Sequence, residues 1–293
     1  MNLLAVITHY PNQEACIAHL ERVRWGNCPA CPYCGSLDVA RKREGKLVGR
    51  WNCHDCKDSF NVLAGTVMQK TKIPLVKWFA AIALIVNAKK SLSSCQLARD
   101  LQMNQGTAWY LMQRIRSAMA TDQGGFLQGV VEADETYLGG RPRKPNKRSA
   151  TRNNPRGRGT SKTPVLGAVE RNGRVRAMVA DDAKARTILK FIKNSVDPRN
   201  SVLVTDELNV YQSVRGYIRH FAVDHKTRYS DRSGGHTNTI EGFWGLLKRA
   251  WYGQHHHYQR QYSPLYVAEA AWKYNHRKDT DGWASLVRLV FGV

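Results

Sequence analysis

Residues 129–140, GVVEADETYLGG, and residues 201–207, SVLVTDE, have the β-branched content and the apolar runs of buried strands. Between them, residues 164–180 contain the dipeptide Asn172-Gly173, which favours a hairpin. Residues 181–196 follow, with apolar side chains on one helical face and two aspartates at their start. The order strand, hairpin, helix, strand predicts a mixed α/β domain.

A basic segment interrupts these strands. Residues 141–162 hold nine Lys or Arg and no acid, which predicts a basic loop. The whole chain has 45 Lys plus Arg against 23 Asp plus Glu, a formal charge of +22, so nucleic acid is the expected partner. A membrane surface is the weaker alternative, because the positive charge is not confined to one tail or one amphipathic helix. The longest apolar stretch, residues 78–86, is far shorter than the roughly 20 residues that span a bilayer.

Two aspartates follow apolar runs in the predicted strands. Asp134 comes after VVEA and Asp206 after VLVT, so we expect each carboxylate at the carboxyl end of its strand. Adjacent strands would bring both to one site, where they repel each other unless a cation neutralises them, and oxygen ligands suit Mg²⁺ or Mn²⁺. The alternative is that each acid only begins a turn. Glu132 shares the strand face of Asp134, so alternation alone does not choose between them.

A third acid lies on a predicted helix. In residues 236–249, HTNTIEGFWGLLKR, the side chains of Asn238, Glu241 and Lys248 follow at three- and seven-residue steps and share a polar face. Trp244 could stack on unpaired bases at a DNA end, but at helical spacing we expect it in the core. We expect Glu241 to complete the metal site and Lys248 to meet a DNA phosphate. A solvated polar stripe on an amphipathic helix is the alternative.

Upstream, residues 91–119 predict a pair of helices. Apolar residues recur at three- and four-residue spacing on both sides of a polar break at residues 104–106. A helix-turn-helix would present polar side chains of its second helix to DNA, here Gln105, Thr107, Tyr110 and Arg114. A plain helical hairpin gives the same periodicity and remains the alternative.

The N-terminal stretch lacks the basic start and the small-residue cleavage site of a signal peptide, so we expect the chain in the reducing cytoplasm. Its seven cysteines are then expected as metal ligands or as residues without a functional role. Two CxxC pairs, Cys31 with Cys34 and Cys53 with Cys56, are separated by 18 residues, the spacing of a tetrahedral zinc site. Four thiolates leave no open coordination position, so this Zn²⁺ would be structural. Cys28 offers an alternative ligand.

These features divide the chain into three expected parts. Residues 1–66 form an N-terminal segment with the zinc ribbon, residues 67–122 the helix-turn-helix region, and residues 123–293 the α/β domain with the basic loop.

In combination, these motifs resemble one family. VEADETYLGG (131–140), VLVTDELNVY (202–211) and the segment 236–249, preceded by the cysteine ribbon and the helix pair, are similar to the IS1595-type (ISXO2-like) insertion-sequence transposases over residues 28–277. The resemblance implies an RNase H-like catalytic domain. It also implies a metal-binding DDE triad, which corresponds to Asp134, Asp206 and Glu241, at separations of 72 and 35 residues.

The resemblance assigns further residues to the site. His225 and His236 match histidines that would hold the scissile phosphate or a metal-bound water, with a structural hydrogen bond as the alternative. Lys248 matches the extended motif. Asn238 stays open as the third metal ligand in place of Glu241, because certain relatives are described with asparagine there.

The function implied is that of a DNA transposase. It would bind the terminal inverted repeats of an insertion sequence and cleave and join double-stranded DNA, transposon ends and target alike, by a two-metal mechanism. A dimer or a larger assembly on DNA, associated with a prokaryotic nucleoid, is expected by resemblance. The alternatives are an RNase H-like nuclease that does not join strands, and a zinc-ribbon and helix-turn-helix regulator with an inert catalytic domain.

Overall fold

The computed structural model describes residues 1–42, 49–122, 124–139, 162–206, 209–223 and 236–291. The predicted basic loop, apart from Lys162, and His225 lie outside these ranges. The chain forms two compact units, one of Met1–Asp122 with Lys278–Val293 and the other of Gln123–Arg277. Within the described ranges, no helix combines the length and the apolar character needed to cross a bilayer.

A small antiparallel sheet lies in the first unit. It has the order β1-β2-β3, and Trp51 of β2 pairs with Phe60 of β3. The ring of Trp25 packs edge-on against both at centroid distances of 5.9 Å. A core of so few side chains does not hold a sheet by itself, the condition in which small modules use a metal ion. The elements are α2 (Gln13–Trp25), β1 (Val39–Arg41), β2 (Arg50–Cys53) and β3 (Ser59–Asn61).

Helix α3 (Leu75–Asn87) is the centre of the helical part of this unit. Its side chains are almost all apolar and most are buried, as expected of a helix with neighbours on all sides. It contacts α1 (Leu3–His9), α2, α5 (Gln105–Met119) and α9 (Gly282–Phe291), while α4 (Ser94–Asp100) packs against α5. The pair α4 and α5, with α5 beginning at Gln105, matches the two helices predicted for residues 91–119.

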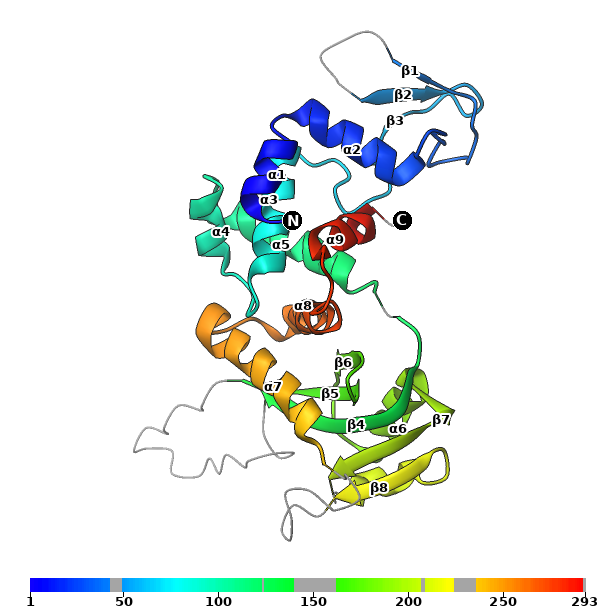
Figure 1. Cartoon of the computed structure of the whole chain (residues 1–293), viewed down its shortest axis with the longest axis vertical. Helices are drawn as coiled ribbons and strands as arrows, with labels where there is room; N and C mark the ends of the chain where they lie inside the picture. Colours follow the sequence, from blue (N-terminus) through cyan, green and yellow to red (C-terminus); the bar gives the residue numbers. More distant parts are fainter. Residues whose placement is uncertain (43–48, 123, 140–161, 207–208, 224–235, 292–293) are drawn as a thin grey trace, which may run out of the picture. The chain divides into compact units, whose positions relative to one another are not determined.

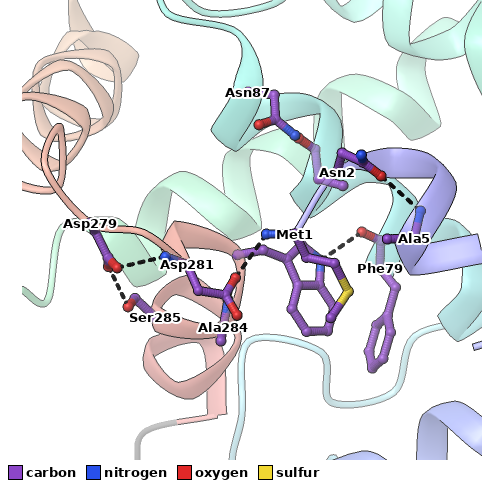
Figure 2. Close-up of polar contacts among 11 residues, drawn as sticks. Met1, Asn2, Ala5, Phe79, Asn87, Asp279, Asp281, Ala284 and Ser285 are labelled. Carbon is purple, nitrogen blue, oxygen red and sulfur yellow. Dashed lines mark hydrogen bonds and ion pairs between the residues drawn. The ribbon is translucent and has the colours of Figure 1, made fainter. Parts of the chain in front are cut away.

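The C-terminal segment packs in the first unit, although the sequence assigned it to the catalytic domain. Trp283 of α9 is 1% exposed, and its indole donates to the carbonyl of Phe79 on α3 at 3.2 Å. Figure 2 shows how the carboxylates of Asp279 and Asp281 accept hydrogen bonds at the start of α9. The compact unit therefore differs from the predicted domain of residues 123–293, because α9 buries its apolar face against α3. The boundary between residues 66 and 67 stays a prediction.

The second unit is built on a five-stranded mixed sheet of order β6-β5-β4-β7-β8. Antiparallel pairing joins β6, β5 and β4, and parallel pairing joins β4, β7 and β8, so β4 lies between β5 and β7 (Figure 1). Asn172, with φ of 63°, lies in the predicted hairpin between β5 and β6. The strands are β4 (Leu127–Leu138), β5 (Thr163–Glu170), β6 (Val175–Val179), β7 (Val196–Asp206) and β8 (Arg219–Val223).

Helices cover both faces of this sheet. Alternate residues of β5 divide between two cores: Leu166 packs with α6 and Val165 with α7 and α8. Val131 of β4 also faces α6. Successive residues of a strand point to opposite faces, so Glu132, the next residue, faces α7. The helical elements are α6 (Ala185–Ser195), a 3-10 helix (Asn209–Val214), α7 (Asn238–Ala250), a π-helical turn (Trp251–His255), a 3-10 turn (Arg260–Tyr262) and α8 (Ser263–Asn275).

Two local features differ from the sequence prediction. Helix α6 begins at Ala185 rather than at the aspartates, because the carboxylate of Asp182 accepts hydrogen bonds from the Lys184 amide and the Thr187 hydroxyl and so holds a turn. The edge strand β8 was not predicted. Most of its side chains are not buried, so it lacks the apolar alternation by which strands are recognised.

Candidate active site

Asp134 and Asp206 come from neighbouring parallel strands. The registered pairing of β4 and β7 runs to Glu132 opposite Val204, and each aspartate lies two residues further along its strand. Asp206 is the last residue of β7, as predicted. The prediction that Asp134 also ends its strand was wrong, because β4 stays paired with β5 as far as Leu138. Asp134 instead lies just past the last registered parallel pair.

The surroundings of Asp134 disfavour its charged form. Burial is the largest cause, and the carboxylates of Glu135 and Asp206 add to it, so the pKa of Asp134 is raised to about 7. Hydrogen bonds from the backbone N–H of Glu135 and from the indole of Trp244 act in the opposite direction. A cation beside Asp134 and Asp206 would relieve the repulsion and the cost of burial, so the pair suits a divalent ion.

Trp244 of α7 contacts Asp134 directly. Its Nε1 donates to Oδ2 of Asp134 at 2.9 Å. The ring occupies the space over Gly167, the residue paired with Asp134 on β5, where an added Cβ would lie 2.5 Å from Cη2 of Trp244. Helical spacing predicts that Trp244 is buried, and the structure confirms this. The spacing does not predict that its hydrogen-bond partner lies on a strand.

Glu132 is fully buried and has a different role from Asp134. Its Oε2 accepts hydrogen bonds from the amides of Thr239 and Ile240 at 2.8 and 3.1 Å. Its Oε1 accepts from the Thr239 hydroxyl at 2.9 Å and from Nε of Arg171 at 2.8 Å. Nδ1 of His236 lies 3.2 Å from Oε1 but without hydrogen-bond geometry. Glu132 is thus committed to the first turn of α7, a role that strand parity did not predict.

The remaining predicted site residues lie on α7. Asn238, Glu241 and Lys248 are all exposed, in contrast to the buried Ile240, Phe243, Trp244 and Leu247. Oε1 of Glu241 accepts a hydrogen bond from the Thr237 hydroxyl at 3.3 Å. Across the described part of the chain, the one set of three or more metal-ligating groups within mutual reach is a cysteine set. The structure therefore brings Asp134 and Asp206 to neighbouring strands without gathering Glu241 against them.

The cysteine set consists of Cys31, Cys34, Cys53 and Cys56, whose sulfurs all lie within 4.8 Å of one another. The Sγ atoms of Cys31 and Cys56 are 3.7 Å apart, and those of Cys34 and Cys53 are 3.6 Å apart. Four sulfurs at about 2.3 Å from a tetrahedral Zn²⁺ would be about 3.8 Å from one another, so the geometry fits structural zinc. Cys28 is exposed and is not part of the set.

Helix α5 carries the four side chains predicted to meet DNA, and two of them are exposed. Gln105 is exposed and its Nε2 donates to the Ser94 hydroxyl at 2.7 Å. Tyr110 is 54% exposed, and the guanidinium of Arg114 lies 5.5 Å from its ring centroid. Arg114 also donates to the carbonyl of Gln69 at 3.0 Å. Thr107 is half-buried. These contacts are compatible with both a DNA-reading helix and a plain helical hairpin.

Two of the solved structures that match this chain illustrate the partial likeness. One is the crystal structure of a pre-cleavage Mos1 transpososome, with a TM-score of 0.27 and 11% identity over 71% of this chain and 77% of that one. The other is the crystal structure of the Mos1 Strand Transfer Complex, with a TM-score of 0.25 and 11% identity over 71% and 76% of the two chains.

Sequence comparison identifies the family. A curated relative, an uncharacterized protein in transposable element ISH50 of Halobacterium salinarum, is 28% identical over 246 residues, 80% of this chain and 82% of that one. The family model for the transposase zinc-ribbon domain matches residues 11–59. The model for the ISXO2-like transposase domain matches residues 126–275, about half of the chain. Both matches confirm the resemblance, and this zinc-ribbon protein belongs to the IS1595-type, ISXO2-like transposase family.

Proposed function

We propose that this chain is a transposase that binds the terminal inverted repeats of its element and carries out metal-dependent cleavage and joining of DNA strands. The observation that carries the proposal is the placement of Asp134 and Asp206 two residues beyond the last registered pair of adjacent parallel strands, at the side of the sheet where α7 packs. A family match alone would leave an inert descendant possible, whereas this pair retains the acid chemistry of a metal site.

Asp134 and Asp206 would hold the metal ions through their carboxylate oxygens. Oδ2 of Asp134 accepts the hydrogen bond from the Trp244 indole, which orients the carboxylate. Bound Mg²⁺ or Mn²⁺ would supply activation of the attacking hydroxyl and stabilisation of the leaving oxygen. The protein's own part is to hold the carboxylates in place and to bind the DNA backbone.

Helix geometry favours Glu241 over Asn238 as the third ligand. Successive residues of an α-helix are separated by about 100°, so Glu241 is about 60° around the helix from Trp244 and Asn238 about 120°. Because Trp244 contacts Asp134, Glu241 has the shorter path to the carboxylate pair. Lys248 is about 40° from Trp244 on the same side, a position suited to a phosphate of bound DNA.

The rest of the chain suits DNA as the substrate. The formal charge of +22 supplies electrostatic attraction that is independent of sequence. The zinc ribbon and the helix pair α4 and α5 would locate the transposon ends, with Gln105 and Tyr110 as exposed candidates for base or backbone contacts. The five-stranded mixed sheet suits the RNase H-like class, and the family resemblance implies a dimer or larger assembly on DNA.

The test uses the full chain, DNA carrying the inverted repeats that flank its gene, and Mg²⁺ or Mn²⁺. Asp134→Asn, Asp206→Asn and Glu241→Gln should each abolish cleavage of end DNA and joining of pre-cleaved ends while leaving end binding intact. Asp181→Asn, the same change at an exposed acid whose contact is a surface ion pair with Arg260, is the matched control and should retain activity.

The outcomes separate the competing functions. Cleavage without joined products would indicate a nuclease, and specific binding without metal-dependent cleavage would indicate a regulator. Retained cleavage in Asp134→Asn or Asp206→Asn would reject this active site. Loss of cleavage in Asn238→Ala but not in Glu241→Gln would transfer the third position to residue 238.

A further inference from the structure

The first turn of α7 is capped from a distant part of the chain. The first amides of a helix lack partners within the helix, and a nearby Ser, Thr, Asp or Asn usually accepts from one of them. Here the N-cap residue Thr237 makes no such side-chain bond. The amides of Thr239 and Ile240 instead donate to the carboxylate of Glu132, more than 100 residues earlier in the sequence.

The carboxylate of Glu132 has no capacity left for a metal ion. A carboxylate offers about four lone-pair sites. Two amides, the Thr239 hydroxyl and Nε of Arg171 provide four donors, all between 2.8 and 3.1 Å. Arg171 also neutralises the buried charge, and its Nη2 donates to the carbonyl of His236, just before the helix, at 2.8 Å. Glu132 and Arg171 therefore act on the position of α7 and not on a ligand.

Two carboxylates of one strand fix this helix at two points. Glu132 binds the amides of Thr239 and Ile240, and Asp134 accepts the indole proton of Trp244. Two residues of a strand advance about 6.7 Å, and the four to five residues between these helical contacts advance about 6 to 7.5 Å. The spacings match, so α7 can satisfy both contacts at once as it runs beside β4.

We propose that Glu132, paired with Arg171, is a positioning residue that sets the rotation and height of α7 and thereby holds Glu241 in reach of the metal ions at Asp134 and Asp206; this rests on the proposed function. Glu241 lies in the first turn of α7, directly after the capped amides. A small tilt or rotation of an uncapped first turn would therefore displace Glu241. Outer-shell partners of metal ligands typically change metal affinity by 10- to 100-fold when removed.

The experiment measures Mn²⁺ binding to the zinc-loaded full chain by the loss of the free-ion electron paramagnetic resonance signal, and Mn²⁺ dependence of end cleavage. Glu132→Gln should weaken Mn²⁺ affinity about tenfold or more. The Mn²⁺ concentration that gives half-maximal cleavage should rise by the same factor. Hydrogen exchange at the amides of Thr239 and Ile240 should become faster. Glu269→Gln is the matched control, since Glu269 is 2% exposed and paired with Lys273 on α8.

Non-additivity separates positioning from a general loss of stability. In a Glu241→Gln background, Glu132→Gln should cause no further loss of Mn²⁺ affinity, because Glu132 acts through Glu241. Unchanged affinity in Glu132→Gln, a further loss in the double variant, or an equal loss in Glu269→Gln would each overturn the inference. If one of these outcomes occurs while the wild-type protein cleaves end DNA normally, only the inference about Glu132 is rejected and the proposed function stands. If the wild-type protein binds no Mn²⁺, both the inference and the proposed function are rejected.

Discussion

At the scale of single residues, the packing of the Trp244 ring against Asp134 depends on the absence of a side chain at Gly167. Gly167→Ala should force the Trp244 ring away, because the added Cβ would lie 2.5 Å from Cη2 and 2.7 Å from Cζ2. Such overpacking costs about 1 to 3 kcal/mol of folding free energy, and here it also removes the hydrogen bond that orients Asp134. We expect lower Mn²⁺ affinity and slower cleavage, measured with the unfolding transition.

The control for this substitution is Gly242→Ala. Gly242 lies on α7 with no atom within 4 Å of an added Cβ, and alanine in a helix interior is more stable than glycine by up to about 1 kcal/mol. This variant should melt at the wild-type temperature or above it and should bind Mn²⁺ normally. Wild-type Mn²⁺ affinity in Gly167→Ala would contradict the role given to Trp244.

Sequence reasoning reached some of these residues and not others for a physical reason. Asp134 and Asp206 follow apolar strand runs, and strand runs are visible in local periodicity. The contacts of Glu132 and Trp244 join β4 to α7 across 107 to 110 residues of sequence, and no local pattern encodes a partner at that distance. Strand alternation correctly placed Glu132 and Asp134 on one face of the sheet. It did not predict which of the two accepts the hydrogen bonds from the helix amides.

At the scale of elements, the ribbon β1-β2-β3 should depend on its metal ion. Its fully buried core consists of two of the cysteines, Phe60 and Ala64, while Trp25, Val39 and Trp51 are only partly buried. Zinc binding and folding of this sheet are therefore expected to be coupled. Cys53→Ser should release zinc and lower the stability of the ribbon, and a strong chelator should do the same to the wild-type chain. Zinc content per chain and hydrogen exchange of residues 50–61 provide the measurement.

The matched control is Cys28→Ser, since this exposed thiol stands outside the group of four sulfurs. That variant should retain one zinc ion per chain and wild-type exchange. If instead Cys28→Ser loses zinc, or Cys53→Ser keeps it, the ligand set is different.

The zinc ribbon could be predicted from the CxxC spacing, because the spacing of metal ligands is a local property of the sequence. Strand β8 could not be predicted, because only Val223 in it is buried and its sequence lacks an apolar pattern.

At the scale of the molecule, the two ends of the sequence belong to one folding unit. Trp283→Ala should cost about 3 to 5 kcal/mol, as for other large buried aromatic side chains, and should loosen α3 through the lost contact with Phe79. Hydrogen exchange should accelerate in residues 75–87 and stay unchanged in residues 127–138. The exposed Tyr110→Ala should change stability by no more than about 0.5 kcal/mol. Faster exchange in β4 and not in α3 would instead assign α9 to the second unit.

The same unit should lose stability in mild acid through His19. Its ring lies among Tyr10, Phe79 and Trp283, and burial first, then the positive charge of Arg22, lowers the pKa of His19 below 6.5. Below pH about 6.5 the unfolded chain therefore binds a proton that the folded unit resists, so this stability is complete above that pH and is lost as the pH falls toward the lower folded pKa. The melting temperature should fall less between pH 7.5 and 5.5 in His19→Gln than in wild type, while His9→Gln, at an exposed position on α1, should keep the wild-type difference. An identical fall in His19→Gln would show that the acid sensitivity arises elsewhere, with His220 of β8, whose pKa is also lowered by burial, as the next residue to substitute.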